Sequence, residues 1–132
     1  MGDGITSDIV AFGGALYFGA DDGINGIEPW KSDGTDGGTV LLRHINDNGD
    51  SSAQFFTVSG ATLYFSAVDP TNGAELWKSD GTPVGTVLVE DIRPGPNSSS
   101  VHGLVDVGGT LFFSADDGIN GRELWASDGT LA

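Results

Sequence analysis

The stretch ELWKSDGT occupies residues 75–82, and closely similar stretches, EPWKSDGT and ELWASDGT, occupy residues 28–35 and 123–130. Their tryptophans, which are separated by 47 and 48 residues, are Trp30, Trp77 and Trp125. The residues before each stretch also repeat, as ALYFGADDGING, TLYFSAVDPTNG and TLFFSADDGING. The chain of 132 residues therefore contains three copies of one structural unit.

The period and the composition of the repeat predict an all-β fold. The chain contains 22 glycines, and the apolar residues of each unit alternate with polar ones, as in strands. A helical repeat of similar length would need helical segments that such a sequence cannot form. We therefore expect residues 1–132 to be a single β-propeller fragment with four-stranded antiparallel blades, one in each of the repeats at about residues 8–45, 55–92 and 103–130.

The second unit indicates where the strands of one blade lie. Four strands are predicted, at residues 55–61, 62–67, 74–80 and 85–92. In the second of these strands Leu63, Phe65 and Ala67 point to one side, which predicts a half-buried strand. The proline-containing stretch at residues 93–100 has no such period and is expected to cross to the next blade.

The third unit ends after its SDGT sequence, before any fourth strand. Three blades, the last of them incomplete, are too few for a ring, because propellers have about 4 to 8 blades. Each blade also needs neighbours on both sides to bury its faces. Two copies of the chain would give about six blades, within the usual range. We therefore expect either a homodimer or a piece cut from a longer propeller.

The three stretches E-(L/P)-W-x-S-D-G-T, each preceded by LYF or LFF and an acidic turn, resemble the bacterial tandem-repeat family named after its ELW…DGT signature. The resemblance covers almost the whole chain. It implies β-propeller blades within large, often extracellular proteins, and therefore a secreted or cell-surface location. The sequence MGDGITSD at the start has no basic region followed by an apolar stretch, so no signal peptide is expected in this chain.

The chain departs from the repeated pattern at two positions. Pro29 stands where the other copies have Leu76 and Leu124, and Ala126 stands where the other copies have lysine. Because proline lacks a backbone donor, we expect the first blade to be irregular at Pro29. The resemblance implies a fold more than an activity, since propellers host unrelated functions.

The balance of charges limits the partners of the chain. Five basic residues stand against 19 acidic ones, and the formal net charge of −14 disfavours DNA, RNA and anionic lipid surfaces. The chain has no cysteine, which excludes disulfides and thiolate chemistry. No apolar run reaches the roughly 20 residues that cross a bilayer. We therefore expect no nucleic-acid binding and no membrane insertion.

The acidic turns are the first candidate site, because their side chains offer the oxygen ligands that Ca²⁺ prefers. The candidate metal ligands are Asp21, Asp22, Asn25 and Glu28, then Asp69, Asn72 and Glu75, then Asp116, Asp117, Asn120 and Glu123. The same residue types are typical of hairpin turns in which Asp and Asn bond their own backbone. The turn interpretation is favoured because it needs no ion. Calcium is its alternative, and no other cofactor is expected.

Two further repeated features could be structural or functional. The aspartates of the SDGT sequence, Asp33, Asp80 and Asp128, could bind a ligand, but an aspartate that accepts N–H bonds across a turn is the favoured interpretation. The tryptophans Trp30, Trp77 and Trp125 could stack on sugars, but packing between blades is favoured for a large aromatic residue at one blade position.

Catalysis has little support in the sequence. His44 and His102 occupy non-equivalent positions, and no Ser-His-Asp arrangement is indicated. No carboxylate pair suited to glycoside cleavage can be selected among 19 acids. We therefore expect no enzyme but a structural, adhesive or binding scaffold. A carbohydrate-binding lectin that uses the blade loops is the alternative, and a glycosidase-like propeller is the second alternative.

Overall fold

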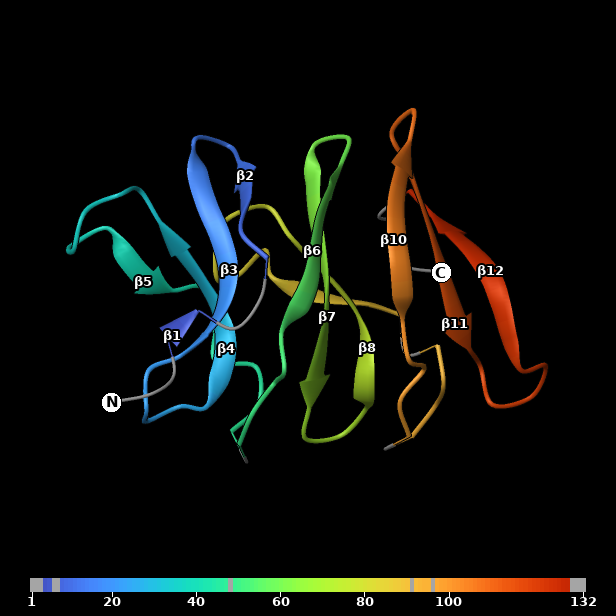
Figure 1. Cartoon of the computed structure of the whole chain (residues 1–132). Coiled ribbons are helices and arrows are strands. Elements are labelled where there is room, and N and C mark those ends of the chain that lie inside the picture. Colours follow the sequence, from blue (N-terminus) through green and yellow to red (C-terminus); the bar gives the residue numbers. More distant parts are fainter. Residues whose placement is uncertain (1–3, 6–7, 48, 91, 96, 129–132) are drawn as a thin grey trace.

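The computed structural model of the chain describes residues 4–5, 8–47, 49–90, 92–95 and 97–128. These residues form twelve strands and no helix. The strands make three antiparallel sheets that lie side by side in sequence order (Figure 1). None of the sheets in this part of the chain closes on itself, and nothing in it resembles a membrane-spanning helix. The all-β fold predicted from the repeats is confirmed.

The first sheet begins before the predicted first repeat. Its strands are β1 (Gly4–Ile5), β2 (Val10–Phe12), β3 (Ala15–Asp21), β4 (Ile27–Ser32) and β5 (Thr39–Leu41). Both β1 and β2 pair with β3, with Ile5 opposite Ala20 and Val10 opposite Tyr17. The two short strands are thus pieces of one edge, so that the sheet has five strands instead of the four expected.

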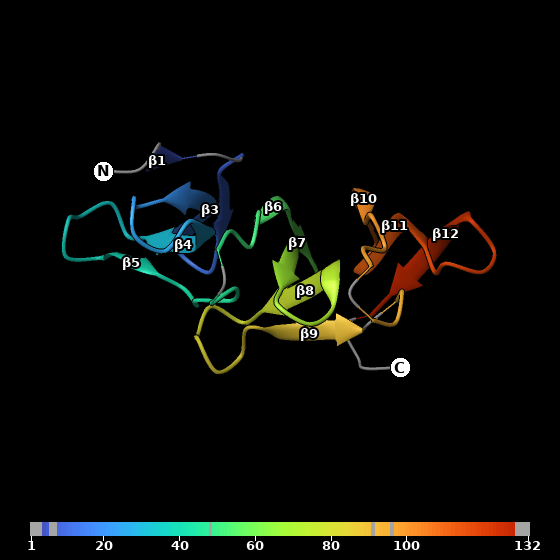
Figure 2. The ribbon, with the colours of Figure 1, turned by 90° about the horizontal axis from the view of Figure 1, so that it is seen from below.

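The second sheet has the four strands expected of a unit. In order they are β6 (Gln54–Ser59), β7 (Thr62–Asp69), β8 (Gly73–Ser79) and β9 (Val87–Glu90). The prediction that β7 is half-buried is wrong, because Leu63 and Phe65 on one side and Tyr64 on the other are all at most 2% exposed. The reason is that the second sheet lies between the other two (Figure 2).

The third sheet has three strands, β10 (His102–Val107), β11 (Thr110–Asp116) and β12 (Arg122–Ser127). Among the described residues β12 pairs with β11 alone, from Arg122 opposite Asp116 to Ser127 opposite Leu111. The described part of the third sheet therefore ends at β12.

Pro29 shortens the pairing of the first sheet. It lies within β4 opposite Gly19, and the register of this strand pair is continuous. In the second sheet Leu76 pairs with Glu90 of the outer strand, but at Pro29 no such pair forms, and β5 pairs with β4 from Trp30 onward. The missing N–H of proline accounts for the difference.

The core lies between the sheets. The cluster between the first and second sheets consists of Tyr17, Leu42, Ile45, Ala53, Phe56, Leu63, Phe65, Ala67 and Trp77. The cluster between the second and third sheets consists of Tyr64, Leu76, Val89, Ile92, Val101, Leu111, Phe113 and Ala115. Each sheet is therefore stabilised by the apolar surface that it buries against its neighbour.

The connecting segments join neighbouring sheets through hydrogen bonds. The backbone of Ser51 donates to the carbonyl of Ile27 in the first sheet at 2.8 Å and accepts from Val68 N in the second at 2.7 Å. Asp50 Oδ1 accepts from Ile27 N at 2.8 Å. The Ser51 backbone thus bridges two sheets.

The same bridge recurs at the next junction. Ser99 N donates to Ala74 O at 3.0 Å, and Ser99 O accepts from Asp116 N at 2.8 Å. Ser98 Oγ takes the role of the Asp50 carboxylate, since it accepts from Ala74 N at 3.0 Å. The two junctions are therefore built by one set of contacts.

Candidate functional site

The acidic turn of the first sheet is held by its own side chains. Asp21 Oδ1 accepts from Gly23 N at 2.7 Å, and Asp22 Oδ1 accepts from the backbone N–H groups of Ile24 and Asn25 at 2.9 and 2.8 Å. Asp22 Oδ2 also accepts from Asn25 Nδ2 at 2.6 Å. These contacts are those of an aspartate that caps a turn.

The other two acidic turns use the same bonds. In the second sheet Asp69 accepts from the N–H groups of Thr71 and Asn72 and from Asn72 Nδ2. In the third sheet Asp116 accepts from Gly118 N, and Asp117 accepts from Ile119 N, Asn120 N and Asn120 Nδ2. The turn of the second sheet thus has the same pattern of hydrogen bonds around Asp69, although it contains one acidic residue fewer than the other two.

The bonds within the turns favour ionised aspartates. The N–H of Asn25, followed by that of Ile24, holds the pKa of Asp22 below its usual value. The N–H groups of Asn120 and Ile119 do the same for the pKa of Asp117. These carboxylates therefore act as hydrogen-bond acceptors for the backbone N–H groups of their own turns.

The glutamates that follow the turns lie elsewhere. Glu28 is fully buried, and its two carboxylate oxygens accept from Ile45 N at 2.9 Å and from Asn46 N at 3.0 Å. Burial raises the pKa of Glu28, although these bonds act against the rise. Glu75, also fully buried, accepts in the same way from Ile92 N at 3.0 Å and Arg93 N at 3.4 Å.

These positions do not fit a calcium site. A Ca²⁺ ion needs about 6 to 8 oxygen ligands around one point. Glu28 accepts hydrogen bonds from residues 17 and 18 positions further along the chain, whereas Asp22 accepts hydrogen bonds within its own turn. Within the described ranges no group of three or more His, Asp or Glu side chains is arranged to hold a metal ion.

The SDGT sequence forms a compact hydrogen-bonded turn. Asp33 Oδ1 accepts from Thr35 N at 3.0 Å and from Thr35 Oγ1 at 2.7 Å, and Asp80 makes the same bonds to Thr82. These bonds lower the pKa of both aspartates. The third SDGT sequence spans residues 127–130, and of these only Ser127 and Asp128 are among the described residues.

Two of the three tryptophans, Trp77 and Trp125, lie at the junctions between the described sheets. Trp77 is 6% exposed and belongs to the cluster between the first and second sheets, while Trp125 packs against the next cluster. Trp30, which is partly buried, occupies the same position in the first sheet. The indole Nε1 of all three is buried without a hydrogen-bond partner. A sugar-stacking platform needs an open ring face, which Trp77 lacks.

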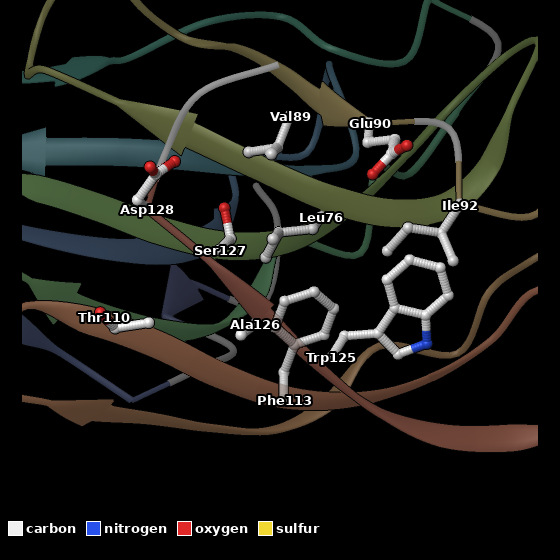
Figure 3. Close-up of a pocket in the computed structure, with 10 residues that line it drawn as sticks. All are labelled: Leu76, Val89, Glu90, Ile92, Thr110, Phe113, Trp125, Ala126, Ser127 and Asp128. Atoms are coloured by element: carbon white, nitrogen blue, oxygen red, sulfur yellow. The ribbon is translucent and has the colours of Figure 1, made fainter. Parts of the chain in front are cut away.

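A cavity of about 460 Å³ lies between the second and third sheets. It is lined by Leu76, Val89, Glu90, Ile92, Thr110, Phe113, Trp125, Ala126, Ser127 and Asp128. Figure 3 shows Ile92, Phe113 and Trp125 pointing into the same space, with Glu90 and Asp128 at its border. The lining of this cavity is therefore mixed, with apolar side chains beside the carboxylates of Glu90 and Asp128.

The two histidines lie in different surroundings. His44 Nε2 is 3.6 Å from the Glu28 carboxylate, and its Nδ1 is 3.3 Å from Asp47. His102 packs edge-to-face on Phe55 with the ring centroids 5.2 Å apart. Neither contact includes a serine nucleophile.

The sequence interpretation missed what the glutamates and the connectors do. Glu28 and Glu75 were grouped with the turns that precede them, because their bonding partners lie a whole strand downstream. The connectors could have been found by aligning the GDSS of residues 49–52 with the NSSS of residues 97–100. Both segments place a serine at the bridge between sheets.

Comparison with known proteins supports the fold alone. No protein-family model and no curated protein matches the chain. A solved structure from a structural and mechanistic analysis of two prolyl endopeptidases is similar, with a TM-score of 0.52 and 15% sequence identity. The match covers 91% of this chain and 19% of that chain, so this chain spans about a fifth of its length.

Proposed function

We propose that the chain is a non-enzymatic module of β-propeller blades, which serves as a structural or binding scaffold of a bacterial surface or secreted protein in the ELW…DGT repeat family. The observation that carries this proposal is the junction between sheets, which is built twice with the same contacts. Ser51 bridges to Ile27, and Ser99 bridges to Ala74 in the same way. A structure that repeats its junction is suited to extension by further blades.

The outer faces of the molecule support the extension. Leu16 of the first sheet is 42% exposed, whereas Leu63 and Leu111 in the corresponding positions are fully buried by the preceding sheet. Further sheets from a second copy would bury Leu16 in the same manner. Two copies give about six blades, which lies within the range of closed propellers.

The alternatives have weaker support. A lectin that stacks sugars on tryptophan needs an exposed ring, but Trp77 is 6% exposed. A glycosidase needs two carboxyl groups placed about 5 to 9.5 Å apart across a substrate site. The acids of the turns instead bond their own backbone.

The scaffold proposal is tested by the solution mass of the intact chain and of a variant with a charged outer face. Light scattering of the chain should give the mass of a dimer, and Leu16→Asp should give a folded monomer. The matched control is Ile24→Asp, because Ile24 is 88% exposed on a turn. A cooperative monomer of the unmodified chain at micromolar concentration would count against the closed dimer.

A further inference from the structure

A cavity of about 290 Å³, separate from the one beside Trp125, lies between the second and third sheets where their first strands begin. These strands, β6 and β10, lie side by side (Figure 1). The polar side chains that line the cavity are those of Gln54, Ser66, Ser98, Ser100, His102 and Arg122. The chain contains 19 acidic residues, but none of the described residues that line this cavity is acidic. We call it the serine pocket.

Ser66 is a buried polar residue of the serine pocket. It is 4% exposed, and its hydroxyl group forms no hydrogen bond with any described residue. The equivalent residue of the third sheet, Ser114, accepts a hydrogen bond from Arg122 Nη1. In the second sheet Ala74 stands at the position of Arg122 and has no donor in its side chain. Because buried hydroxyl groups are nearly always hydrogen-bonded, the hydroxyl of Ser66 is available to a polar group that enters the pocket.

Arg122 brings a positive charge to the serine pocket. Its Nη1 donates to the carbonyl of Ser100 at 3.1 Å and to the hydroxyl of Ser114. Both acceptors are neutral, and the guanidinium forms no ion pair with a described carboxylate. A guanidinium offers five N–H donors in a planar fork that fits a carboxylate. Since Nη1 makes both bonds, the N–H groups of Nε and Nη2 remain for an anionic ligand.

Phe55 gives the serine pocket a partly apolar wall. Its backbone is left-handed, with φ of 61°, and the equivalent residue of the third sheet is Gly103, with φ of 66°. Such a backbone is rare for a bulky residue, and strained residues cluster at ligand sites. The ring of Phe55 stays 36% exposed and packs edge-to-face on His102. An exposed aromatic face of this kind suits the C–H groups of a ligand.

We propose that the serine pocket binds a hexuronic acid, which is a six-carbon sugar that carries a carboxylate. Arg122 binds the carboxylate, the hydroxyl groups of Ser66 and Ser98 bind hydroxyl groups of the sugar, and Phe55 contacts one face of its ring. A volume of about 290 Å³ is close to the smallest ligand pockets, of about 300 Å³, and suits a single ring. The inference rests on one junction, so it holds for a monomer and for a dimer. It also differs from stacking on tryptophan, because no tryptophan is among the described residues that line the pocket.

The first junction has the same connector but different side chains. Asp50 takes the place of Ser98, since each accepts a hydrogen bond from the backbone of the preceding sheet. Ala74 takes the place of Arg122. The first junction therefore has a carboxylate and no guanidinium at these positions, and a carboxylate disfavours an anionic ligand. The proposed site is thus a property of the second junction, and the first provides the substitutions that test it.

The experiment titrates the ¹⁵N-labelled full chain with sodium D-glucuronate at constant ionic strength and follows the backbone amide chemical shifts. Constant ionic strength holds the screening of the net charge of −14 fixed. We expect saturable shifts of the residues around the serine pocket. D-Glucose, which lacks the carboxylate, and sodium acetate, which lacks the hydroxyl groups, should each bind at least about ten-fold more weakly. The proposal is overturned if either of them binds as tightly as glucuronate.

Ser98→Asp gives the second junction the acid of the first. Asp50 Oδ1 accepts from Ile27 N at 2.8 Å, so an aspartate at residue 98 can keep the bond to Ala74 N and the variant should fold. Its negative charge should abolish glucuronate binding. The matched control is Ile24→Asp, which adds the same charge on an exposed turn of the first sheet and should bind as the unmodified chain does. Equal binding by the two variants would overturn the proposal.

Two further variants separate the charge from the ring. Arg122→Gln should weaken glucuronate binding at least about ten-fold, because hydrogen bonds to charged groups are the stronger ones. Phe55→Gly keeps the left-handed backbone without strain, as at Gly103, and should weaken binding about three-fold through the loss of the ring. The amide spectrum of each variant verifies its fold. An unchanged affinity of a folded Arg122→Gln variant would overturn the proposal.

Discussion

Identical residues of the second and third repeats have different surroundings. Leu76 of the second ELW stretch is 1% exposed, whereas Leu124 of the third is 76% exposed. Both residues are the central residue of an ELW stretch, and both lie within a strand that pairs with an equivalent partner. The difference comes from the neighbouring sheet, which covers Leu76 and is absent beside Leu124. In a repeat structure, burial thus depends on position in the stack more than on local sequence.

The glutamates beside these leucines show the same contrast. Glu75 is fully buried and bonds Ile92 N and Arg93 N, whereas Glu123 is exposed. The glutamate carboxylate therefore accepts these backbone hydrogen bonds only in a sheet with an outer strand, because its partners lie in the segment that follows that strand. Four sets of substitutions test whether the surroundings of a residue depend on its position in the stack.

The largest effect is expected from truncating the two leucines. Leu76→Ala should lower the free energy of unfolding by about 2 to 5 kcal/mol, because it opens a cavity in the core between the second and third sheets. Leu124→Ala should change it by less than about 0.5 kcal/mol, because a surface side chain loses little packing. Urea unfolding followed by tryptophan fluorescence measures both. Equal losses would show that Leu124 is covered in solution.

The sequence predicted the positions of the strands better than it predicted the burial of their side chains. The repeat period and the Gly turns placed β6 to β9 within a few residues, because alternation and turn residues are local properties. The alternation also predicted an open face for β7, but Tyr64 is buried by the third sheet. The burial of Tyr64 depends on contacts with a segment far away in the sequence. The residue pattern of one strand contains no information about such contacts.

The candidate site was predicted least well for the same reason. Asp22 and Asn25 bond within their own turn, so the spacing of the residues sufficed to suggest a turn. Glu28 is only three residues further on, but it bonds Ile45 and Asn46 across the sheet. Glu28 is thus close to Asp22 and Asn25 in the sequence, but in the folded chain it bonds a different segment.

The second prediction compares the two glutamates. Glu75→Ala should cost about 1 to 3 kcal/mol, chiefly because it leaves the buried N–H of Ile92 without an acceptor. Glu123→Ala should leave the unfolding midpoint nearly unchanged. Chemical denaturation of both variants at pH 7 provides the measurement. A tolerated Glu75→Ala would mean that water reaches the N–H groups of Ile92 and Arg93.

The third prediction concerns the irregular starts of the first strands of the second and third sheets, β6 and β10. Phe55 and Gly103 occupy equivalent positions and have left-handed backbones, with φ of 61° and 66°. A side chain at Gly103 would meet nothing within 4 Å, so Gly103→Ala tests the backbone alone. It should cost about 1 to 2 kcal/mol, the penalty of this conformation for a residue with a Cβ. Gly37→Ala is the control, because Gly37 also has open space but no positive φ; it should be neutral or slightly stabilising.

The smallest effect is expected at the acidic turns, and it should be the same at both ends of the molecule. Asp22 and Asp117 are capped by their own turns, so the presence or absence of a neighbouring sheet should not matter. In the folded chain both have a pKa below the usual 3.8, because backbone N–H groups stabilise the charged form. Each therefore contributes stability above pH 3.8 that is lost as the pH falls through the lower folded value.

Asp22→Asn and Asp117→Asn should accordingly lower the unfolding midpoint slightly and equally at pH 7, and the difference from the unmodified chain should vanish near pH 2. Glu28 acts in the opposite direction, because burial raises its pKa above 4.5 and its contribution is lost as the pH rises. Both variants retain Glu28, so its effect cancels when each is compared with the unmodified chain at the same pH. Urea unfolding between pH 2 and 7 measures the two variants. A larger effect at Asp22 than at Asp117 would show that the turns, like the leucines and the glutamates, depend on their place in the stack.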